Sequence, residues 1–90
     1  MFTYPHRLFA NGSSLHYQGT MRMGDADDGT SVADPWSRVW GYDNLVVGGN
    51  ALIPTANTMN PTLMSVAIAV RGARKLADQL ASARVEEVAR

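Results

Sequence analysis

The C-terminal third of the chain has the clearest pattern of apolar and polar positions. One set of positions recurs at intervals of three and four residues, at Leu63, Val66, Ala67, Val70, Ala73, Arg74 and Ala77. Arg71, Lys75 and Asp78 fall elsewhere around the same helix. This spacing predicts an amphipathic helix from about residue 61 to the mid-80s. The charged tail over residues 84–90 is expected to fray.

The start of this helix has signals of its own. Asn60 is a favoured N-cap residue, and Pro61 fits the first helical position, where a backbone donor is not needed. Residues 63–70 are apolar nearly all round, so we expect the first turns to be buried and to point into other protein structure. The N-terminal end of a helix has free N–H groups and a partial positive charge. An anion or an electron-rich ring edge is therefore expected beside it.

Before the helix, short apolar runs alternate with turns. Residues 15–19 predict a short strand, and Val32 begins a predicted edge strand that Pro35 stops. Residues 45–47 form an apolar run closed by two glycines, which is the pattern of a fully buried strand whose end is closely approached. The predicted fold class is α+β, with short strands followed by one long C-terminal helix.

Length and composition indicate that the chain needs other protein surface. It has 90 residues, of which 46% are hydrophobic and 18% are charged, so it matches neither a disordered segment nor a charged tail. A chain this short buries a modest share of its surface. We therefore expect its aromatic and methionine side chains to pack against a partner.

Charge and cysteine content exclude several classes of partner and site. Eight basic and eight acidic residues give a net charge of zero, so no net field attracts nucleic acid or an anionic membrane. Cysteine is absent, which excludes disulfides and zinc–sulfur sites. The first seven residues lack the features of a secretory signal, and no apolar run is long enough to span a bilayer. These features predict a cytoplasmic location.

Most of the chain is expected to carry no chemistry of its own. It lacks the glycine-rich dinucleotide and Walker motifs and the serine nucleophile elbow. Asp25, Asp27 and Asp28 lack the spacing and the closing glutamate of a calcium loop, so a solvated turn is expected and no metal site. His6 is expected to be structural. Any catalytic chemistry must be shared with another part of a larger protein.

Two blocks of sequence are the exception. The first begins at His16 and has the pattern H-x-x-G-T-x-R-M-G, and the second contains I-P-T-A from Ile53 and N-P-T-L from Asn60. Together they resemble the closing motifs of the glucose-methanol-choline (GMC) oxidoreductases. Gly48-Gly49, in place of the family's more common Asp-Ala, resembles the branch of pyranose 2-oxidases and bacterial glycoside 3-oxidases. The resemblance runs from residue 13 to about residue 80.

The resemblance implies a division of roles along the chain. In that family the last segment completes a Rossmann-like FAD-binding domain that begins near the N-terminus of an α/β enzyme. Residues 1–44 would then belong to the substrate domain and carry the catalytic histidine, and residues 45–90 would supply the last strand and helix of the FAD-binding domain. The main partner would be the N-terminal FAD-binding part, and this segment would be inactive alone. The whole enzyme is also a candidate homo-oligomer.

The resemblance also assigns two catalytic residues. His16 stands where the family has its catalytic histidine, and Asn60 stands where it has the hydrogen-bonding partner. Oxidation of an alcohol needs a proton to leave oxygen while a hydride leaves carbon, and an imidazole can take that proton near neutral pH. The amide of Asn60 can donate a hydrogen bond to the same oxygen. The alternatives are a structural histidine and a plain N-cap.

The cofactor implied by the resemblance is FAD. The residues implied to contact it are Gly48, Gly49, Asn50, Pro61, Thr62 and Leu63. The first three would approach the ribityl and pyrophosphate groups, where a side chain would obstruct. The last three, at the start of the helix, would face the flavin N1/O2 edge, which gains negative charge on reduction.

The implied function is oxidation of a secondary alcohol of a sugar or glycoside to a ketone, with hydride transfer to the flavin. The electron acceptor would be oxygen or a quinone. One alternative is a dehydrogenase of the same family that uses an acceptor other than oxygen. Another is a non-enzymatic small subunit that docks through the helix, and a third is an independent metal- or ligand-binding module.

Overall fold

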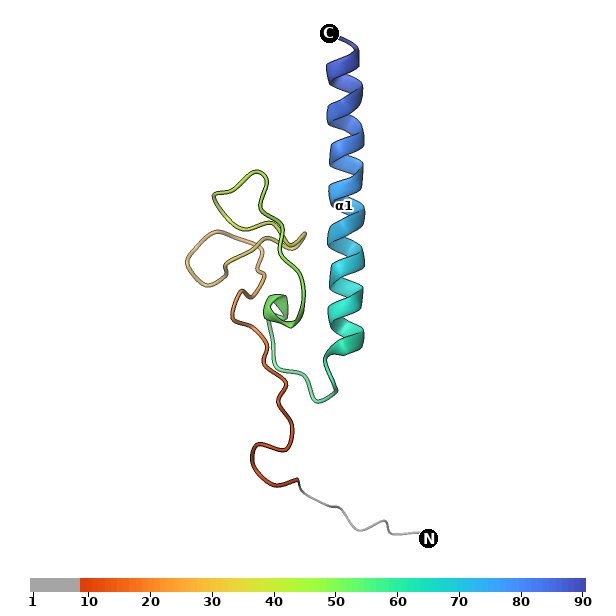
Figure 1. Cartoon of the computed structure of the whole chain (residues 1–90). Coiled ribbons are helices and arrows are strands. Elements are labelled where there is room, and N and C mark those ends of the chain that lie inside the picture. Colours follow the sequence, from red (N-terminus) through yellow and green to blue (C-terminus); the bar gives the residue numbers. More distant parts are fainter. Residues whose placement is uncertain (1–8) are drawn as a thin grey trace.

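A computed structural model describes residues 9–90, so His6 and the start of the predicted 1–44 segment lie outside the described residues. Two helices are present in this range, the short 3-10 helix η1 (Asn50–Leu52) and the long helix α1 (Thr62–Val88). The residues before α1 form a body of loops beside the N-terminal half of the helix (Figure 1). The C-terminal half of α1 extends past these loops.

Backbone hydrogen bonds hold the loops together. The amides of Gly19, Met21 and Met23 donate to the carbonyl oxygens of three successive residues of η1, Asn50, Ala51 and Leu52, at 3.2, 3.0 and 3.0 Å. Residues 19–23 therefore run alongside η1. This pairing fixes the first motif block against the segment that leads to the second.

The predicted strands are wrong as continuous strands within residues 9–90. The structure has isolated bridges instead, which pair Met23 with Ala33, Ala33 with Val39, and Arg38 with Val46. Turns interrupt each pairing after one residue, so no ladder extends. Residues 15–19 form no bridge at all.

The buried core is small. It consists of Ala33, Leu52, Ile53 and Ile68, with Met23 and Val47 packed against it. Residues 45–47 are not fully buried within the described chain, because Leu45 is 41% exposed and its two neighbours are half-buried. Their burial by other protein structure stays a prediction.

The long helix agrees with the predicted one in position but differs at both ends. Its N-cap is Pro61, already in the helical region at φ −77° and ψ −5°, and no side chain caps the helix. The prediction that Asn60 caps the helix is therefore wrong. The predicted fraying of residues 84–90 is also wrong, because the helix continues to Val88.

The face that α1 turns to the loops is not the predicted apolar face. The buried or half-buried positions toward the loops are Pro61, Ser65, Ile68, Gly72, Lys75 and Leu76. A Cβ at Gly72 would lie 2.9 Å from the Ser37 Oγ and 3.2 Å from the Trp36 carbonyl oxygen, so the loop approaches the helix where a side chain is lacking. The predicted face remains exposed, with Leu63 73% and Val70 44% accessible. Residues 9–90 therefore do not cover the first turns, and the prediction that other protein structure buries them stays a prediction.

Side chains join the loops to α1 at two further levels. The guanidinium of Arg71 lies 4.4 Å from the centre of the Trp36 ring, and the ammonium of Lys75 lies 5.3 Å from it. One turn farther on, Arg38 donates a hydrogen bond to Gln79. Cation–π contacts at partly exposed rings contribute about 0.5–1 kcal/mol each, so they support the docking rather than create it.

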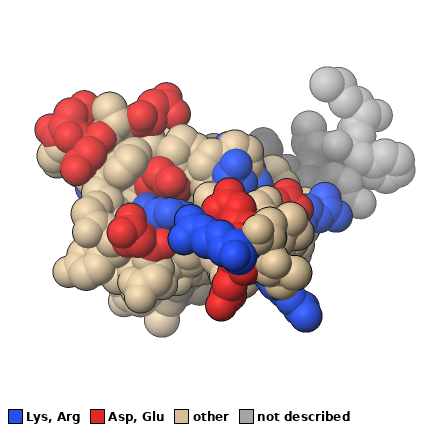
Figure 2. Space-filling model, turned by 90° about the horizontal axis from the view of Figure 1, so that it is seen from above, with Lys and Arg blue, Asp and Glu red and all other residues tan. Residues whose placement is uncertain are grey.

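The whole molecule is extended. Its radius of gyration is 18.2 Å and its extents are 69 × 31 × 20 Å, whereas a compact chain of this length would have a radius of gyration of roughly 12 Å. Charged groups of both signs lie side by side on the face seen along the helix (Figure 2), in keeping with the net charge of zero. No described helix is both long enough and apolar enough to cross a lipid bilayer.

Candidate active site

The two predicted catalytic residues line one hollow on the surface. This hollow has a volume of about 710 Å³, and its lining residues are Phe9, Ser13, Ser14, Leu15, His16, Asn57, Thr58, Met59 and Asn60. His16 comes from the first motif block, and Asn60 comes from the residues that lead into α1. The structure therefore brings together two side chains that are far apart in the sequence.

The convergence has a local cause at Gly19. Its backbone has φ +79°, its amide donates to the Asn50 oxygen at 3.2 Å, and a Cβ there would lie 3.3 Å from the Ile53 oxygen. A residue with a side chain would be strained in this conformation. Gly19 thus lets the segment after His16 lie against residues 50–53. Residues 54–59 then lead to Asn60, which lines the same hollow as His16.

His16 has one hydrogen-bond partner within residues 9–90. Its Nδ1 atom lies 3.0 Å from the hydroxyl oxygen of Ser14, and both side chains are exposed. The Nε2 atom has no partner in the described part of the chain. One ring nitrogen is thereby held and the other is available for chemistry.

Asn60 is also available. It does not cap α1, and its amide makes no side-chain hydrogen bond to any residue in the range 9–90. An amide that the fold does not use can donate to a ligand in the hollow at no cost to the helix.

A second, apolar hollow of about 140 Å³ continues onto the start of α1. It shares three lining residues with the first hollow and adds three residues of the helix, so its lining consists of Asn57, Met59, Asn60, Leu63, Met64 and Ala67. The polar hollow and the exposed apolar start of the helix are therefore one continuous region of the surface.

The predicted FAD-contacting residues lie in two segments that the fold connects. Gly48 and Gly49 precede η1, and Asn50 begins it. The hydroxyl of Ser65, in the first turn of α1, donates a hydrogen bond to the Asn50 side chain. This bond ties the residues around Asn50 to the helix start.

The arrangement suits an elongated anionic group. A Cβ at Gly48 or at Gly49 would meet no atom within 4 Å, so open space lies next to this backbone. The first turn of α1 contains no acidic residue and no capping side chain, which leaves its N–H groups and partial positive charge uncompensated. Pro61 is buried, whereas Thr62 and Leu63 are exposed. These residues fit the cofactor that the sequence resemblance implies.

The acidic turn lies apart from this region. Hydrogen bonds from the hydroxyl and the amide of Thr30, at 2.6 and 3.0 Å, hold the pKa of the Asp28 carboxyl below its usual value. These bonds account for the carboxylate within a solvated turn. Residues 9–90 contain no group of three or more side chains suited to hold a metal ion.

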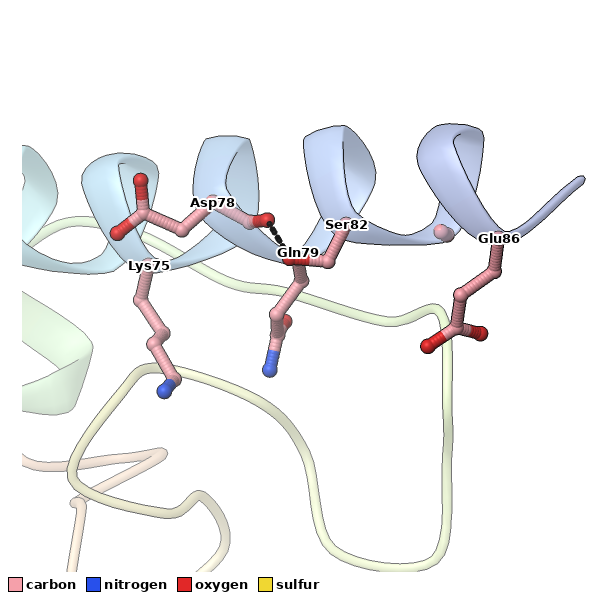
Figure 3. Close-up of a pocket in the computed structure, with 6 residues that line it drawn as sticks. Lys75, Asp78, Gln79, Ser82 and Glu86 are labelled. Carbon is pink, nitrogen blue, oxygen red and sulfur yellow. Dashed lines mark hydrogen bonds between the residues drawn. The ribbon is translucent and has the colours of Figure 1, made fainter. Parts of the chain in front are cut away.

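Another hollow, of about 320 Å³, lies along the C-terminal half of α1 (Figure 3). Its lining comes from one helix, namely Lys75, Asp78, Gln79, Ser82, Ala83 and Glu86. Within it the Ser82 hydroxyl donates to the backbone oxygen of Asp78 at 3.0 Å. None of the predicted site residues lies there.

The contact between Ser14 and His16 was not predicted from the sequence. Ser14 lies two residues before the first motif block, and nothing in the spacing distinguishes it from its neighbour Ser13. A serine two residues before a candidate base is a weak signal in a sequence. The 3.0 Å distance from the Ser14 Oγ to the His16 Nδ1 shows that the two side chains are in contact.

A family model and the similar known proteins place the chain in one family. A family model described as GMC oxidoreductase matches residues 5–69. The chain is 62% identical to a C-glycoside 3-oxidase of Arthrobacter globiformis over 72 residues, which cover 80% of this chain and 14% of the relative. It is 64% identical to a C-glycoside 3-oxidase of Microbacterium trichothecenolyticum over 69 residues, 77% of this chain and 13% of the relative.

A fungal relative extends the comparison. The chain is 50% identical to a pyranose 2-oxidase of Tricholoma matsutake over 78 residues, which cover 87% of this chain and 14% of the relative. The chain thus spans about a seventh of the length of these curated relatives, since the matched shares are 13–14%. The family match includes both motif blocks.

Proposed function

Because the chain belongs to the GMC oxidoreductase family, we propose that it is the C-terminal catalytic segment of a FAD-dependent sugar or glycoside oxidoreductase. The relatives named as C-glycoside 3-oxidase and pyranose 2-oxidase support a sugar alcohol as the substrate class. The observation that carries the proposal is the shared hollow with His16 and Asn60 in its lining.

In this proposal His16 is the base that takes the hydroxyl proton of the substrate. Its Nε2 atom is the available one, because Nδ1 is next to Ser14. The O–H bond breaks as Nε2 gains the proton, the carbonyl forms, and the hydrogen on carbon leaves with its electron pair. A positioned base of this kind contributes about 10²- to 10⁴-fold to the rate.

Asn60 orients the same substrate oxygen. Its amide N–H donates a hydrogen bond that strengthens as negative charge develops on that oxygen. The apolar hollow next to it, once covered by the remainder of the enzyme, would limit access of water and so favour this interaction. Base and donor together fix the position of the reacting carbon.

FAD, when bound, would supply the hydride acceptor. Gly48, Gly49 and Asn50 would hold its ribityl and pyrophosphate region, where the space beside the glycines is open. Pro61, Thr62 and Leu63 would present the positive end of α1 to the ring edge that gains charge on reduction.

The remainder of the site is proposed to come from an N-terminal FAD-binding part, with which residues 45–90 would complete a Rossmann-like domain and residues 1–44 would supply the substrate side. The segment is proposed to be inactive alone. A dehydrogenase with an acceptor other than oxygen is the second candidate. The rates of turnover with oxygen and with a quinone as electron acceptor distinguish an oxidase from a dehydrogenase.

The experiment is anaerobic flavin reduction in the FAD-loaded enzyme that contains this chain. Sugar or glycoside should bleach the flavin absorption in the parent protein, and His16→Ala should slow that step by about 10²- to 10⁴-fold with FAD still bound. Asn57→Ala is the matched control, since Asn57 lines the same hollow but has no proposed role. Full-speed reduction in His16→Ala would remove the base assignment. A protein that copurifies without flavin would favour the docking subunit.

A further inference from the structure

We propose that Ser14 is a positioning residue, which holds His16 in the tautomer that leaves Nε2 ready to accept the substrate proton. The inference rests on the proposed function for the role of His16. The observation behind it is the 3.0 Å separation of the Ser14 Oγ and the His16 Nδ1. Both side chains also line the hollow that contains Asn60.

The need for such a residue follows from the chemistry of imidazole. A neutral imidazole has one N–H group and one lone pair, and only the nitrogen with the lone pair can act as a base. For Nε2 to be that base, Nδ1 must carry the hydrogen. The hydrogen bond made by one ring nitrogen determines which tautomer is present.

A serine hydroxyl can donate to a bare Nδ1 or accept from Nδ1–H, and the proposal assigns it the accepting role before and after proton transfer. Its oxygen can accept a hydrogen bond from Nδ1–H in the neutral ring. When Nε2 has taken the substrate proton, both ring nitrogens are donors, and the same oxygen continues to accept from Nδ1–H. The contact therefore persists through the reaction and fixes the ring orientation.

The chain contains a matched control one residue away. The hydroxyl of Ser13 donates to the backbone oxygen of Ala10 at 2.5 Å, and the Ser13 amide donates to the same oxygen at 3.1 Å. Ser13 also lines the hollow, but its hydroxyl closes a turn and does not touch His16. Removal of the Ser13 hydroxyl tests a change of similar size at nearly the same place.

The first measurement is nitrogen NMR of the FAD-loaded enzyme labelled with ¹⁵N-histidine, with the His16 signals assigned by their loss in His16→Gln. In the parent protein and in Ser13→Ala, neutral His16 should carry its hydrogen on Nδ1. In Ser14→Ala the hydrogen should move toward Nε2, and Ser14→Thr, which keeps a hydroxyl, should restore the parent spectrum. An unchanged tautomer in Ser14→Ala would overturn the proposal whether or not sugar is oxidised.

The second measurement is the rate of flavin reduction by sugar at saturating concentration in the same proteins. Ser14→Ala should be slower by about 3- to 10-fold, the range for loss of one net hydrogen bond, with Ser13→Ala and Ser14→Thr near the parent rate. A tautomer change without a change in rate would overturn the positioning role. If His16→Ala keeps full activity, the proposed function fails instead, while the NMR result still decides the contact between Ser14 and His16.

Discussion

At the scale of single residues, Asn60 can be tested for its proposed catalytic role separately from a capping role. An asparagine before Pro61 is a typical N-cap, yet no side chain caps α1 and the helix begins with Pro61 itself. Substitution of Asn60 should therefore leave the stability of the helix unchanged. An effect on the rate can then be assigned to chemistry.

Asn60→Ala should slow flavin reduction by an amount equivalent to about 2–3 kcal/mol, because it removes one donor to the oxygen that gains charge. Asn60→Asp should be slower still, since a carboxylate repels that developing charge. Stopped-flow reduction traces measure both, and thermal unfolding checks that stability is unchanged. A larger loss in Asn60→Ala than in His16→Ala would exchange the two assigned roles.

The two glycines before η1 differ in what a substitution would test. Gly49 has φ +91°, so any side chain there strains the backbone whatever lies nearby. Gly48 has no such conformation, and a Cβ on it would meet no atom within 4 Å. Gly48 is the better position at which to ask whether a cofactor approaches.

Replacement of Gly48 by alanine and then by valine should lower FAD occupancy in that order, because each added carbon enters the space assigned to the cofactor. The flavin absorbance per protein gives the occupancy. The unfolding temperature of the FAD-free protein should stay near the parent value in both variants. Full FAD content in Gly48→Val would show that the cofactor does not pass this residue.

At the scale of elements, the turn over residues 34–38 is built to dock on α1. The Asp34 carboxylate accepts hydrogen bonds from the backbone amides of Trp36 and Arg38 at 2.8 and 2.9 Å, and these bonds close the turn. Ser37 then lies at φ +76°, is 2% exposed, and has a hydroxyl without a hydrogen-bond partner. Its close neighbour on the helix is Gly72.

Gly72→Ala should destabilise the protein by about 1–2 kcal/mol, although alanine is the better helix former, because its Cβ would lie 2.9 Å from the Ser37 Oγ. Ser37→Gly removes that hydroxyl and suits the positive φ, so Gly72→Ala should cost less in its presence, with the Trp36 carbonyl oxygen at 3.2 Å as the remaining close contact. Denaturant unfolding of the parent, the two single variants and the double variant gives the coupling between the two substitutions in the free energy of unfolding. Additive effects of the two substitutions would contradict this account of the contact.

The sequence predicted the helix well and the strands poorly for identifiable reasons. The helix follows from local spacing and from Pro61, which need no partner. A strand needs a neighbour in register, and the runs at Val32 and at residues 45–47 find only single bridges. The face of α1 that packs against the loops was not predicted, because the loops pack where Gly72 lacks a side chain and not where the apolar residues lie.

The candidate site was predictable only in part. Periodicity and composition did not single out His16 or Asn60, and the resemblance to a family did. That the two residues line one hollow depends on the close approach at Gly19, which a strand pattern does not reveal. The contact of Ser14 with His16 depends on side-chain rotation and could only come from the structure.

At the scale of the whole molecule, the chain leaves much of its apolar surface uncovered. Within residues 9–90 the core has four buried hydrophobic residues, and large apolar side chains are exposed both around the hollow and along α1. Those at least half exposed near the hollow and the helix start are Phe9, Leu15, Tyr17, Met59, Leu63, Met64 and Val66. Contiguous apolar surface of this kind marks a site of interaction with other protein.

The isolated 90-residue chain should therefore behave as a loose state and bind no FAD. Burial of apolar surface provides most of the free energy that offsets conformational entropy, and four core residues provide little of it. We expect helical circular dichroism from α1, binding of a hydrophobic dye, and a broad thermal transition, as for other states without fixed packing. The enzyme that contains the chain should bind less dye and unfold cooperatively. A sharp two-state transition of the isolated chain with stoichiometric flavin would contradict the dependence on a partner and would favour an independent ligand-binding module.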